Sequence, residues 1–174
     1  MDTKQVARKT LLQAQNKNKA LKDKFRPRWN ELTETECEFL DLETSLALWD
    51  AAISAHVVRK EWSFSSLHSE EFTNDVMSDI DDVCRRISLF DDVDGFCITY
   101  FWRKTGAILT NLSSITKNLN DLMFMCEDEI RFYSHDFNKA LILEGDRTGS
   151  GDRLNYLSVS VSGDWINAWQ ESSK

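Results

Sequence analysis

The spacing of the apolar residues changes at one point in the chain, the turn sequence Asp91-Asp92-Val93-Asp94-Gly95. Before this turn, apolar residues recur every three or four positions, which is typical of helices with one buried face. After it, short apolar runs are separated by turn residues, which is typical of strands. We therefore predict an α+β domain, in which N-terminal helices precede an antiparallel sheet of about four to five strands with one inserted helix.

The first predicted helix covers residues 4–25, which are rich in Lys, Gln, Ala and Leu. Its apolar stripe is thin, and its members alternate spacings of four and three residues. The stripe consists of Ala7, Leu11, Ala14, Asn18, Leu21 and Phe25. We expect Pro27 to end this helix, because the proline ring disfavours helical geometry at Arg26. The stripe packs either on the body of the protein or on a second copy of itself.

Two further helices are predicted before the turn. The sequence Thr33-Glu34-Thr35-Glu36 matches a capping box, in which side chains satisfy the free amide groups of a helix start. The apolar spacing that follows predicts a helix over residues 33–58. A third helix is expected to begin at Ser66 or Ser69 and to run through residues 72–87.

Five strands are predicted after the turn. Their ranges are 96–102, 107–110, 130–134, 140–144 and 154–161. Residues 113–125 interrupt the strands with apolar residues at helical spacing and form the predicted inserted helix. In the last strand, polar residues alternate with leucine and valine, which predicts a sheet that is covered on one face only.

The length of 174 residues indicates a single domain. Residues 1–30 hold nine basic and two acidic side chains, a net charge of +7, whereas residues 31–174 hold 12 basic and 27 acidic ones, a net charge of −15. We therefore expect a basic amphipathic helical arm over residues 1–30 and a single acidic α+β domain over residues 31–174. A terminal segment of opposite charge either docks on its own acidic body or reaches a partner.

The composition excludes several classes of protein. Because each bound phosphate needs a Lys or Arg contact, the acidic body disfavours nucleic acid as the main ligand. No stretch approaches the roughly 18 consecutive apolar residues of a transmembrane helix, and the N-terminus lacks the apolar centre of a secretory signal. Four widely spaced cysteines are typical of buried thiols in a reducing compartment. We expect a cytoplasmic protein, with a mitochondrial presequence over the basic residues 3–26 as the alternative.

The motifs that would specify a chemistry are missing. No Cys-x-x-Cys occurs, and His56, His68 and His135 lie in separate predicted elements, so no metal site is expected. The glycine-rich loop 144–153 holds three carboxylates and lacks the Gly-Lys-Ser/Thr ending of a phosphate-binding loop, and Ser150 lacks the spacing of a nucleophile elbow. We therefore predict no catalytic residue and no cofactor. The enzymatic alternative is a cysteine that pairs in space with a histidine.

The candidate partner-binding residues are acidic, with one tryptophan. They are Asp79, Asp82, Asp91, Asp92, Asp94, Glu127, Asp128, Glu129 and Trp165. The carboxylates form either a solvated face that keeps the protein in solution or a surface that attracts a basic partner. Trp165 and Trp169 are either exposed anchors of an interface or part of the core that the last element closes.

Three stretches of the chain carry a resemblance to a known class of proteins. They are Glu127-Asp128-Glu129-Ile130-Arg131-Phe132-Tyr133, Leu141-Ile142-Leu143-Glu144-Gly145-Asp146-Arg147 and Ser162-Gly163-Asp164-Trp165. In these stretches and in its acidity, the region 31–174 resembles the small immunity proteins encoded beside bacterial polymorphic or contact-dependent toxins. The resemblance implies a protein without catalytic activity that neutralises a basic partner, a toxin domain of the nuclease type, by covering its active site with an acidic surface.

The basic N-terminal arm departs from the style of these immunity proteins. It supports an alternative function, a regulatory or adaptor protein whose basic helix contacts nucleic acid, a membrane or an acidic protein.

Overall fold

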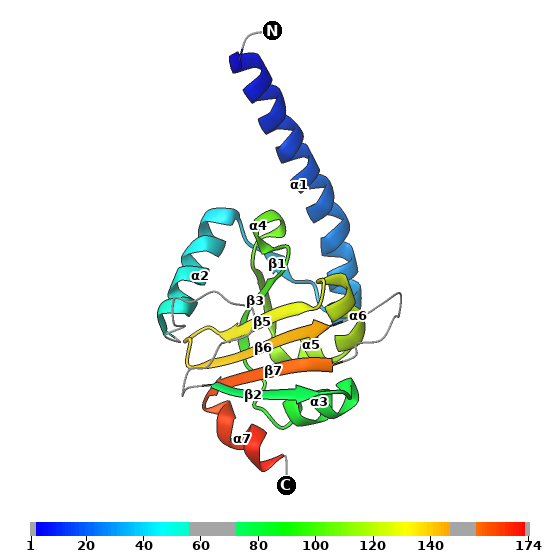
Figure 1. Cartoon of the computed structure of the whole chain (residues 1–174), viewed down its shortest axis with the longest axis vertical. Coiled ribbons are helices and arrows are strands. Elements are labelled where there is room, and N and C mark those ends of the chain that lie inside the picture. The colour runs from blue at the N-terminus through cyan, green and yellow to red at the C-terminus, as the bar shows by residue number, and fades with distance from the viewer. Residues whose placement is uncertain (1–2, 56–71, 147–155, 173–174) are drawn as a thin grey trace.

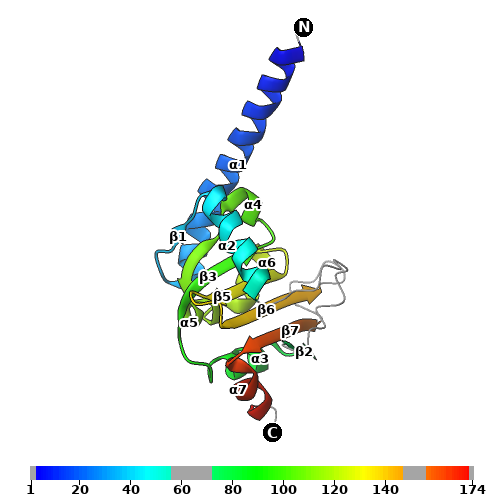
Figure 2. The same cartoon turned by 90° about the vertical axis from the view of Figure 1, so that its left-hand side faces the viewer.

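In the computed structural model, a seven-stranded antiparallel sheet carries helices on both faces (Figures 1 and 2). The structure describes residues 3–55, 72–146 and 156–172. The strands are β1 (Glu38–Phe39), β2 (Phe72–Met77), β3 (Asp94–Thr99), β4 (Ile108–Asn111), β5 (Glu129–Ser134), β6 (Lys139–Asp146) and β7 (Tyr156–Gly163). Their order across the sheet is β1-β4-β3-β5-β6-β7-β2. The predicted α+β class and the antiparallel sheet are confirmed.

The helices in the described residues differ greatly in length. They are α1 (Thr3–Thr33), α2 (Leu42–Ala55), α3 (Ile80–Ile87), α4 (Trp102–Thr105), α5 (Leu112–Thr116), α6 (Leu119–Met125) and α7 (Trp165–Glu171). The first half of α1 projects from the body, at the end of the molecule opposite α7 (Figures 1 and 2). The second half of α1 docks on the body, since Phe25 and Trp29 are buried in the core, so the basic arm combines a docked part with a projecting part.

The core consists of two clusters. Helices α1, α3, α5, α6 and α7 contribute to the larger cluster, in which Phe132 and Trp169 are fully buried. Helices α2 and α4 contribute to the smaller cluster, which includes Phe96 and Tyr133 from the strands. The prediction of a sheet covered on one face only is wrong, because Ser162 of β7 is 1% exposed although it alternates with the apolar residues of the larger cluster.

Helix α1 continues through Pro27, so the prediction that Pro27 ends the first helix is wrong. Phe25, Trp29 and Leu32 lie on one face of α1, and all three are buried in the core. Because this buried face lies on both sides of Pro27, packing keeps the backbone helical although proline offers no amide donor. Pro27 and Asp23 are exposed, so the Asp23 carbonyl that loses its helical donor lies near water.

The predicted helix over residues 33–58 begins too early. Thr33 is the last residue of α1, and its hydroxyl donates to the Trp29 carbonyl at 2.9 Å within the same helix. Helix α2 starts only at Leu42. The preceding residue, Asp41, accepts a hydrogen bond from the Thr44 amide at 2.8 Å. Residues 56–58 lie outside the described residues. The capping box therefore marks the end of one helix and not the start of the next.

Only the second part of the predicted third helix is helical, and its first part forms a strand. Residues 72–77 form β2, which pairs with β7, and the helix α3 begins only at Ile80. Pairing with a neighbouring strand outweighs the helical spacing of these residues, because strand preference depends on tertiary context. The predicted starts at Ser66 and Ser69 lie outside the described residues.

The sheet holds seven strands and not four to five, because β1 and β2 lie in segments that the apolar spacing predicts as helices. The five predicted strands correspond to β3 through β7, and their ends differ by a few residues. The inserted helix is broken into α5 and α6 at Asn118, whose side chain donates to the Leu32 carbonyl at 2.7 Å. This bond holds the break against the C-terminal end of α1.

Candidate protein-binding face

The charged residues of helix α3 are placed where they stabilise the two ends of the helix. Asp79 caps its start and accepts a hydrogen bond from the Asp81 amide at 3.0 Å. Asp81 and Asp82 lie in the first turn and Arg85 and Arg86 in the last turn, so both ends complement the helix dipole. Part of the acidity of this segment therefore stabilises a helix of eight residues.

Arg86 joins α3 to α7, and Asp82 of the same helix holds it in place. The Asp82 carboxylate accepts hydrogen bonds from Arg85 and Arg86, and the bond from Arg85 is the main cause that lowers the pKa of Asp82. The Arg86 guanidinium also lies over the ring of Trp169, 5.2 Å from the ring centroid. This cation–π contact holds the helices α3 and α7 against each other.

Asp91 joins the loop after α3 to the helix α7. The Trp165 indole Nε1 donates to Asp91 Oδ1 at 2.7 Å, and Lys139 Nζ donates to Oδ2 of the same carboxylate. These two bonds lower the pKa of Asp91, and the bond from Lys139 has the larger effect. Beside them, Phe90 stacks on Trp165 with 5.0 Å between the ring centroids.

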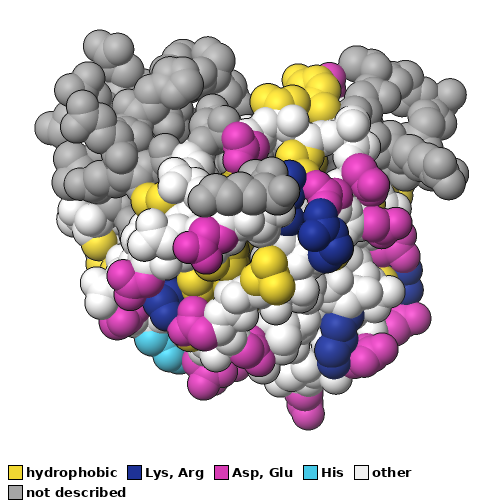
Figure 3. Space-filling view, turned by 90° about the horizontal axis from the view of Figure 1, so that it is seen from below, with side chains coloured by type: hydrophobic (Ala, Val, Ile, Leu, Met, Phe, Trp, Pro, Cys, Tyr) yellow, Lys and Arg dark blue, Asp and Glu magenta, His cyan; other side chains and the backbone are white. Residues whose placement is uncertain are grey.

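Helix α3, the loop 88–94 and helix α7 thus form one surface, which we call the α3–α7 face. It lies at the end of the molecule opposite the projecting part of α1 (Figure 1). Residues 78–94 and 163–172 hold eight acidic and two basic side chains, a net charge of −6. The acidic ones are Asp79, Asp81, Asp82, Asp91, Asp92, Asp94, Asp164 and Glu171. Seen from this end, the molecule shows many carboxylates and few Lys or Arg side chains (Figure 3).

Half of the carboxylates of the α3–α7 face hold the fold. Asp92 Oδ1 accepts a hydrogen bond from the Ser113 amide at 2.9 Å, and Asp79, Asp82 and Asp91 accept the bonds described above. The other four are exposed, and within the described part of the chain their carboxylates make no hydrogen bond or ion pair. They are Asp81, Asp94, Asp164 and Glu171. Leu89, which is 59% exposed, adds an apolar side chain to the same face.

The second acidic segment, residues 127–129, does not belong to the α3–α7 face. Glu129 lies at the start of β5, where it pairs with Glu144, whereas Gly95, the neighbour of Asp94, pairs with Ser134 at the end of β5. The two ends of this six-residue strand are separated by about 17 Å. The two predicted acidic segments therefore do not form one surface.

Residues 127–129 have structural roles of their own. Glu127 and Asp128 adopt positive φ angles of 51° and 63° in the tight turn between α6 and β5. The Asp128 amide donates to the Met123 carbonyl at 2.7 Å and so closes this turn. Glu129 forms an ion pair with Arg131 at 2.9 Å.

Trp165 and Trp169 are buried, with exposures of 2% and 0%. Of the two interpretations of these tryptophans, the structure shows the second, in which they close the core. The Trp169 indole Nε1 donates to the Asp75 carboxylate, as Trp165 donates to Asp91. Trp165 therefore supports the α3–α7 face from beneath and is not an exposed anchor.

An ion network around Arg131 lies on the other face of the sheet, and Glu129 is its only member among the predicted site residues. Arg131 donates to Glu129 at 2.9 Å and to Glu144 at 2.8 Å, and it lies over the ring of Trp49, 5.6 Å from the centroid. Its side chain is 11% exposed. Burial is the main cause that raises the pKa of Glu144, although Arg131 opposes it. The alternation of Glu129, Arg131 and Tyr133 along β5 was the available signal, because apolar residues lie between them.

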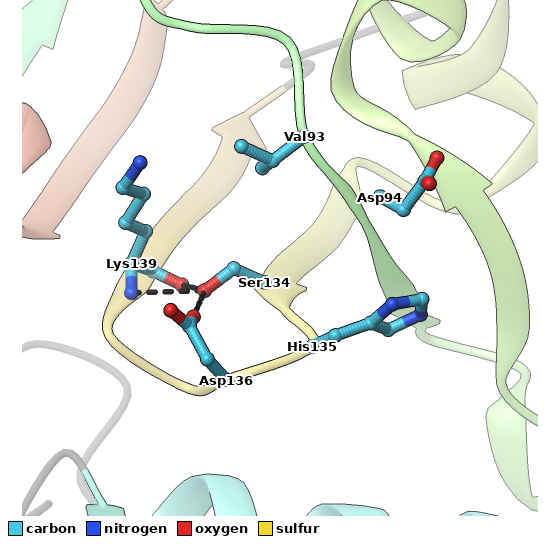
Figure 4. Close-up of a pocket in the computed structure, with 6 residues that line it drawn as sticks. All are labelled: Val93, Asp94, Ser134, His135, Asp136 and Lys139. Carbon is cyan, nitrogen blue, oxygen red and sulfur yellow. Dashed lines mark hydrogen bonds between the residues drawn. The ribbon is translucent and has the colours of Figure 1, made fainter.

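A shallow depression of about 280 Å³ lies beside the turn between β5 and β6 (Figure 4). Its lining residues are Val93, Asp94, Ser134, His135, Asp136 and Lys139. The Ser134 hydroxyl donates to Asp136 at 2.6 Å and accepts from the Lys139 amide at 3.1 Å, so both side chains hold the turn. The bond from Ser134 is the main cause that lowers the pKa of Asp136. His135 points away from Ser134, so the depression holds no pair of nucleophile and base (Figure 4).

The remaining candidate chemistries find little support in the described residues. Among them, no three His, Cys, Asp or Glu side chains are grouped to hold a metal ion. Burial raises the pKa of Cys97 and of Cys126 well above the ordinary value, and it raises the pKa of Cys84 to about 11. His56, His68 and most of the glycine-rich loop lie outside the described residues.

Within the ranges that the structure describes, no helix combines the length and apolarity needed to cross a membrane. Comparisons with known proteins found no match, whether to a family model, to a curated protein or to a solved structure. The function of this chain is therefore inferred from the chemistry of its own surfaces.

Proposed function

We propose that this chain is a protein without catalytic activity that binds and neutralises a basic protein through the α3–α7 face. The observation that carries the proposal is a set of four exposed carboxylates that make no hydrogen bond or ion pair with the described residues. These are Asp81, Asp94, Asp164 and Glu171, and they share a face with the exposed Leu89. Exposed charge around an apolar side chain fits the polar rim and apolar centre of protein interfaces.

The four carboxylates that hold the fold add to the same field. The pKa of Asp82 and the pKa of Asp91 are lowered by their donors, so both side chains remain ionised at neutral pH. A face with a net charge of −6 attracts a basic protein over distance and repels acidic ones. We therefore expect association that is fast at low salt and slows as salt rises.

The partner class that fits this face is a protein that itself binds phosphates. Such proteins carry clustered Lys and Arg side chains, which carboxylates satisfy in place of phosphate groups. A toxin domain of the nuclease type has this chemistry, and it is the partner that the resemblance to immunity proteins implies.

The experiment compares the chain with two matched variants. The face variant combines Asp81→Asn, Asp94→Asn, Asp164→Asn and Glu171→Gln, which leaves every described internal hydrogen bond of the face in place. The control variant makes the same change in net charge at exposed residues elsewhere. It combines Glu36→Gln, Glu43→Gln, Asp50→Asn and Asp121→Asn.

Tagged chains are used to capture partners from lysate of the native cells at low and high salt, and the captured proteins are identified by mass spectrometry. We expect one dominant basic protein with the original chain and the control variant, lost at high salt and lost in the face variant. Its nuclease activity should be absent in the complex and should return at high salt. Equal capture by all three chains would remove the α3–α7 face from the proposal, and capture of nucleic acid or lipid would contradict it.

The adaptor alternative is supported by one observation, the projection of the basic helix α1 away from the body (Figure 2). Deletion of residues 1–16 separates the two functions, because it removes the projecting part of α1 and leaves Phe25, Trp29 and Leu32 in the core (Figures 1 and 2). Under the proposed function, capture of the basic protein persists after this deletion. Under the adaptor function, capture of every partner collapses.

A further inference from the structure

The apolar stripe of α1 extends beyond the part that packs on the body. In the C-terminal part of the helix, Phe25 and Leu32 belong to the core, and Leu21, one turn before Phe25, is half-buried. The positions that continue this stripe upward alternate spacings of three and four residues on the same helix face. They are Asn18, Ala14, Leu11 and Ala7. In the projecting part of α1 this face has no neighbouring element of the described chain (Figures 1 and 2).

The stripe has the spacing of a coiled-coil seam. With Ala7, Ala14 and Leu21 at the d positions, Leu11 and Asn18 occupy the a positions. Alanine at two d positions permits close approach of a second helix, and a single polar residue at an a position is the usual device that fixes register.

The charges beside the seam decide against a second copy of this chain. The e and g positions along residues 7–25 hold four basic and no acidic side chains. The basic ones are Arg8, Lys17, Lys22 and Lys24. In a parallel pair, Lys17 of one helix would face Lys22 of the other, and antiparallel pairs would also juxtapose like charges, which disfavours self-association. The same positions would form ion pairs with Glu or Asp on an acidic helix.

A depression beside the C-terminal part of α1 has room for the end of such a helix. It has a volume of about 260 Å³ and lies where α1 meets the body. Its apolar walls come from Leu21 and Phe25 of α1, from Phe101 beside α4 and from Met125 of α6, and Lys24 and Arg28 stand at its edge. Lys104 adds a further cation, 5.9 Å from the centroid of the Phe101 ring. Apolar walls with basic edges fit an apolar side chain that is flanked by carboxylates.

We propose that the projecting part of α1 binds an acidic amphipathic helix of a partner protein as a heterodimeric coiled coil, whose end occupies the depression at Leu21, Phe25, Phe101 and Met125. This site is independent of the α3–α7 face, because that face is acidic and lies at the other end of the molecule. The chain therefore presents two surfaces of opposite charge to two kinds of protein.

The probe for this proposal is a synthetic peptide of three heptads with Leu at a and d and Glu at e and g. A second peptide of identical composition in scrambled order keeps the charge but removes the seam. Each peptide carries a fluorescent label, and binding to the full chain is followed by anisotropy. We expect the heptad peptide to bind at least about tenfold tighter than the scrambled one, because only the heptad peptide presents apolar residues to the seam.

Three variants assign the binding to the seam. Leu11→Glu places a charge in the seam and should weaken the heptad peptide at least about tenfold. Asn16→Glu places the same charge at an f position on the opposite side of α1 and should leave binding within about twofold. Arg8→Glu with Lys17→Glu should also weaken binding, because the flanking ion pairs become repulsive. The thermal unfolding of each variant should be unchanged, since these positions lie in the first half of α1, which projects from the body (Figures 1 and 2).

Several outcomes would overturn the proposal. Equal binding of the heptad and scrambled peptides would mean that the peptides bind through charge alone. An equal loss of binding in Leu11→Glu and Asn16→Glu would mean that the peptide does not bind at the seam. A dimer of the chain that Leu11→Glu dissociates would assign the seam to a second copy. Competition by duplex DNA or by anionic phospholipid vesicles at matched phosphate would assign α1 to those ligands. The α3–α7 face variant should bind the heptad peptide as the original chain does, so failure here is distinct from failure of the proposed function.

Discussion

The indole Nε1 of Trp165 donates to the carboxylate of Asp91 at 2.7 Å, and the two residues are 74 positions apart in the sequence. The bond lies beneath the α3–α7 face and connects its C-terminal helix to the loop that carries three of its carboxylates. Asp91 is therefore both a surface charge and the acceptor for a buried donor. Substitution at this position tests the fold, whereas substitution at Asp94 tests the surface.

We expect Asp91→Ala to destabilise the protein by about 1–2 kcal/mol, because the indole N–H of Trp165 would remain buried without its acceptor. Urea unfolding followed by tryptophan fluorescence measures this difference. Asp94→Ala is the matched control, since Asp94 is exposed and its carboxylate makes no hydrogen bond to a described residue. Its effect should stay within about 0.5 kcal/mol. Equal effects of the two substitutions would contradict the role assigned to Asp91.

The same substitution should change the response to acid. The pKa of Asp91 is lowered in the folded protein from its ordinary value of 3.8, so its contribution to the free energy of unfolding is present above that value. The contribution is lost as the pH falls through the lower, folded value. We therefore expect the stability of the original chain to fall more steeply below about pH 4 than that of Asp91→Ala. Urea titrations measure this difference. An equal fall in the free energy of unfolding of the two proteins as the pH is lowered would contradict the prediction.

We expect Arg131→Met to cost about 3 kcal/mol at neutral pH, because the substitution leaves the partly buried Glu129 and Glu144 without their cation. The pKa of Glu144 is already raised by burial, and it rises further without Arg131. An acid with a raised folded pKa favours the folded state as the pH falls through that pKa. The loss in Arg131→Met should therefore shrink as the pH is lowered.

The double variant Arg131→Met with Glu144→Gln provides the control for the Arg131 network. Removing one of the two unpaired charges should recover part of the lost stability at neutral pH. Urea unfolding of the single and double variants over a range of pH measures both effects. A loss that does not depend on pH would mean that Arg131 acts through packing on Trp49 alone.

Pro27→Ala should stabilise the protein by about 1–3 kcal/mol, because alanine restores an amide donor inside a helix whose two flanking turns are already in the core. The exposed position of Pro27 means that no packing is lost. Thermal unfolding measures the change, and a substitution to alanine at the neighbouring exposed Arg28 serves as the control. An unchanged or lower melting temperature would show that the proline ring itself contributes to the fold.

The thiol of Cys84 should react slowly with alkylating reagents at neutral pH. Burial, followed by the charges of Asp81 and Asp79, raises its pKa to about 11, so little thiolate is present. The rate should rise tenfold per pH unit up to about that value in the folded protein. Cys84→Ser should abolish this reaction, because the other cysteines are buried. Fast labelling at neutral pH would contradict the assigned environment.

The sequence predicted the strands well where two local signals agreed. In β7, leucine and valine alternate with serine and fit a pleated strand of the sheet, and turn residues bound β5 and β6 on both sides. These signals are local because side chains alternate within the strand itself. Residues 72–77 carried a helical spacing, and only the distant partner β7 determines that they form a strand. The same dependence on distant contacts explains α1, in which Trp29 outweighs the local effect of Pro27.

The candidate binding residues were predictable as residue types but not as a surface. Asp79 and Asp82 were recognisable as acids, yet their roles as cap and ion-pair partner follow from the start of α3 at Ile80. The separation of Glu129 from Asp94 follows from strand register, which charge patterning does not reveal. Asp164 was outside the predicted set, because its place on the α3–α7 face depends on the docking of α7.

The order of the strands has a consequence for the synthesis of this protein. Strand β2 pairs with β7, and the indole groups of α7 donate to Asp75 and Asp91, so these earlier segments find their partners only in β7 and α7. A nascent chain that has emerged as far as residue 155 holds β2 and α3 without these partners. Long-range closure of this kind slows folding and leaves strand edges exposed until β7 and α7 have been synthesised. This part of the fold can therefore close only after α7 has left the ribosome, and a truncation within α7 would affect β2 and the loop after α3.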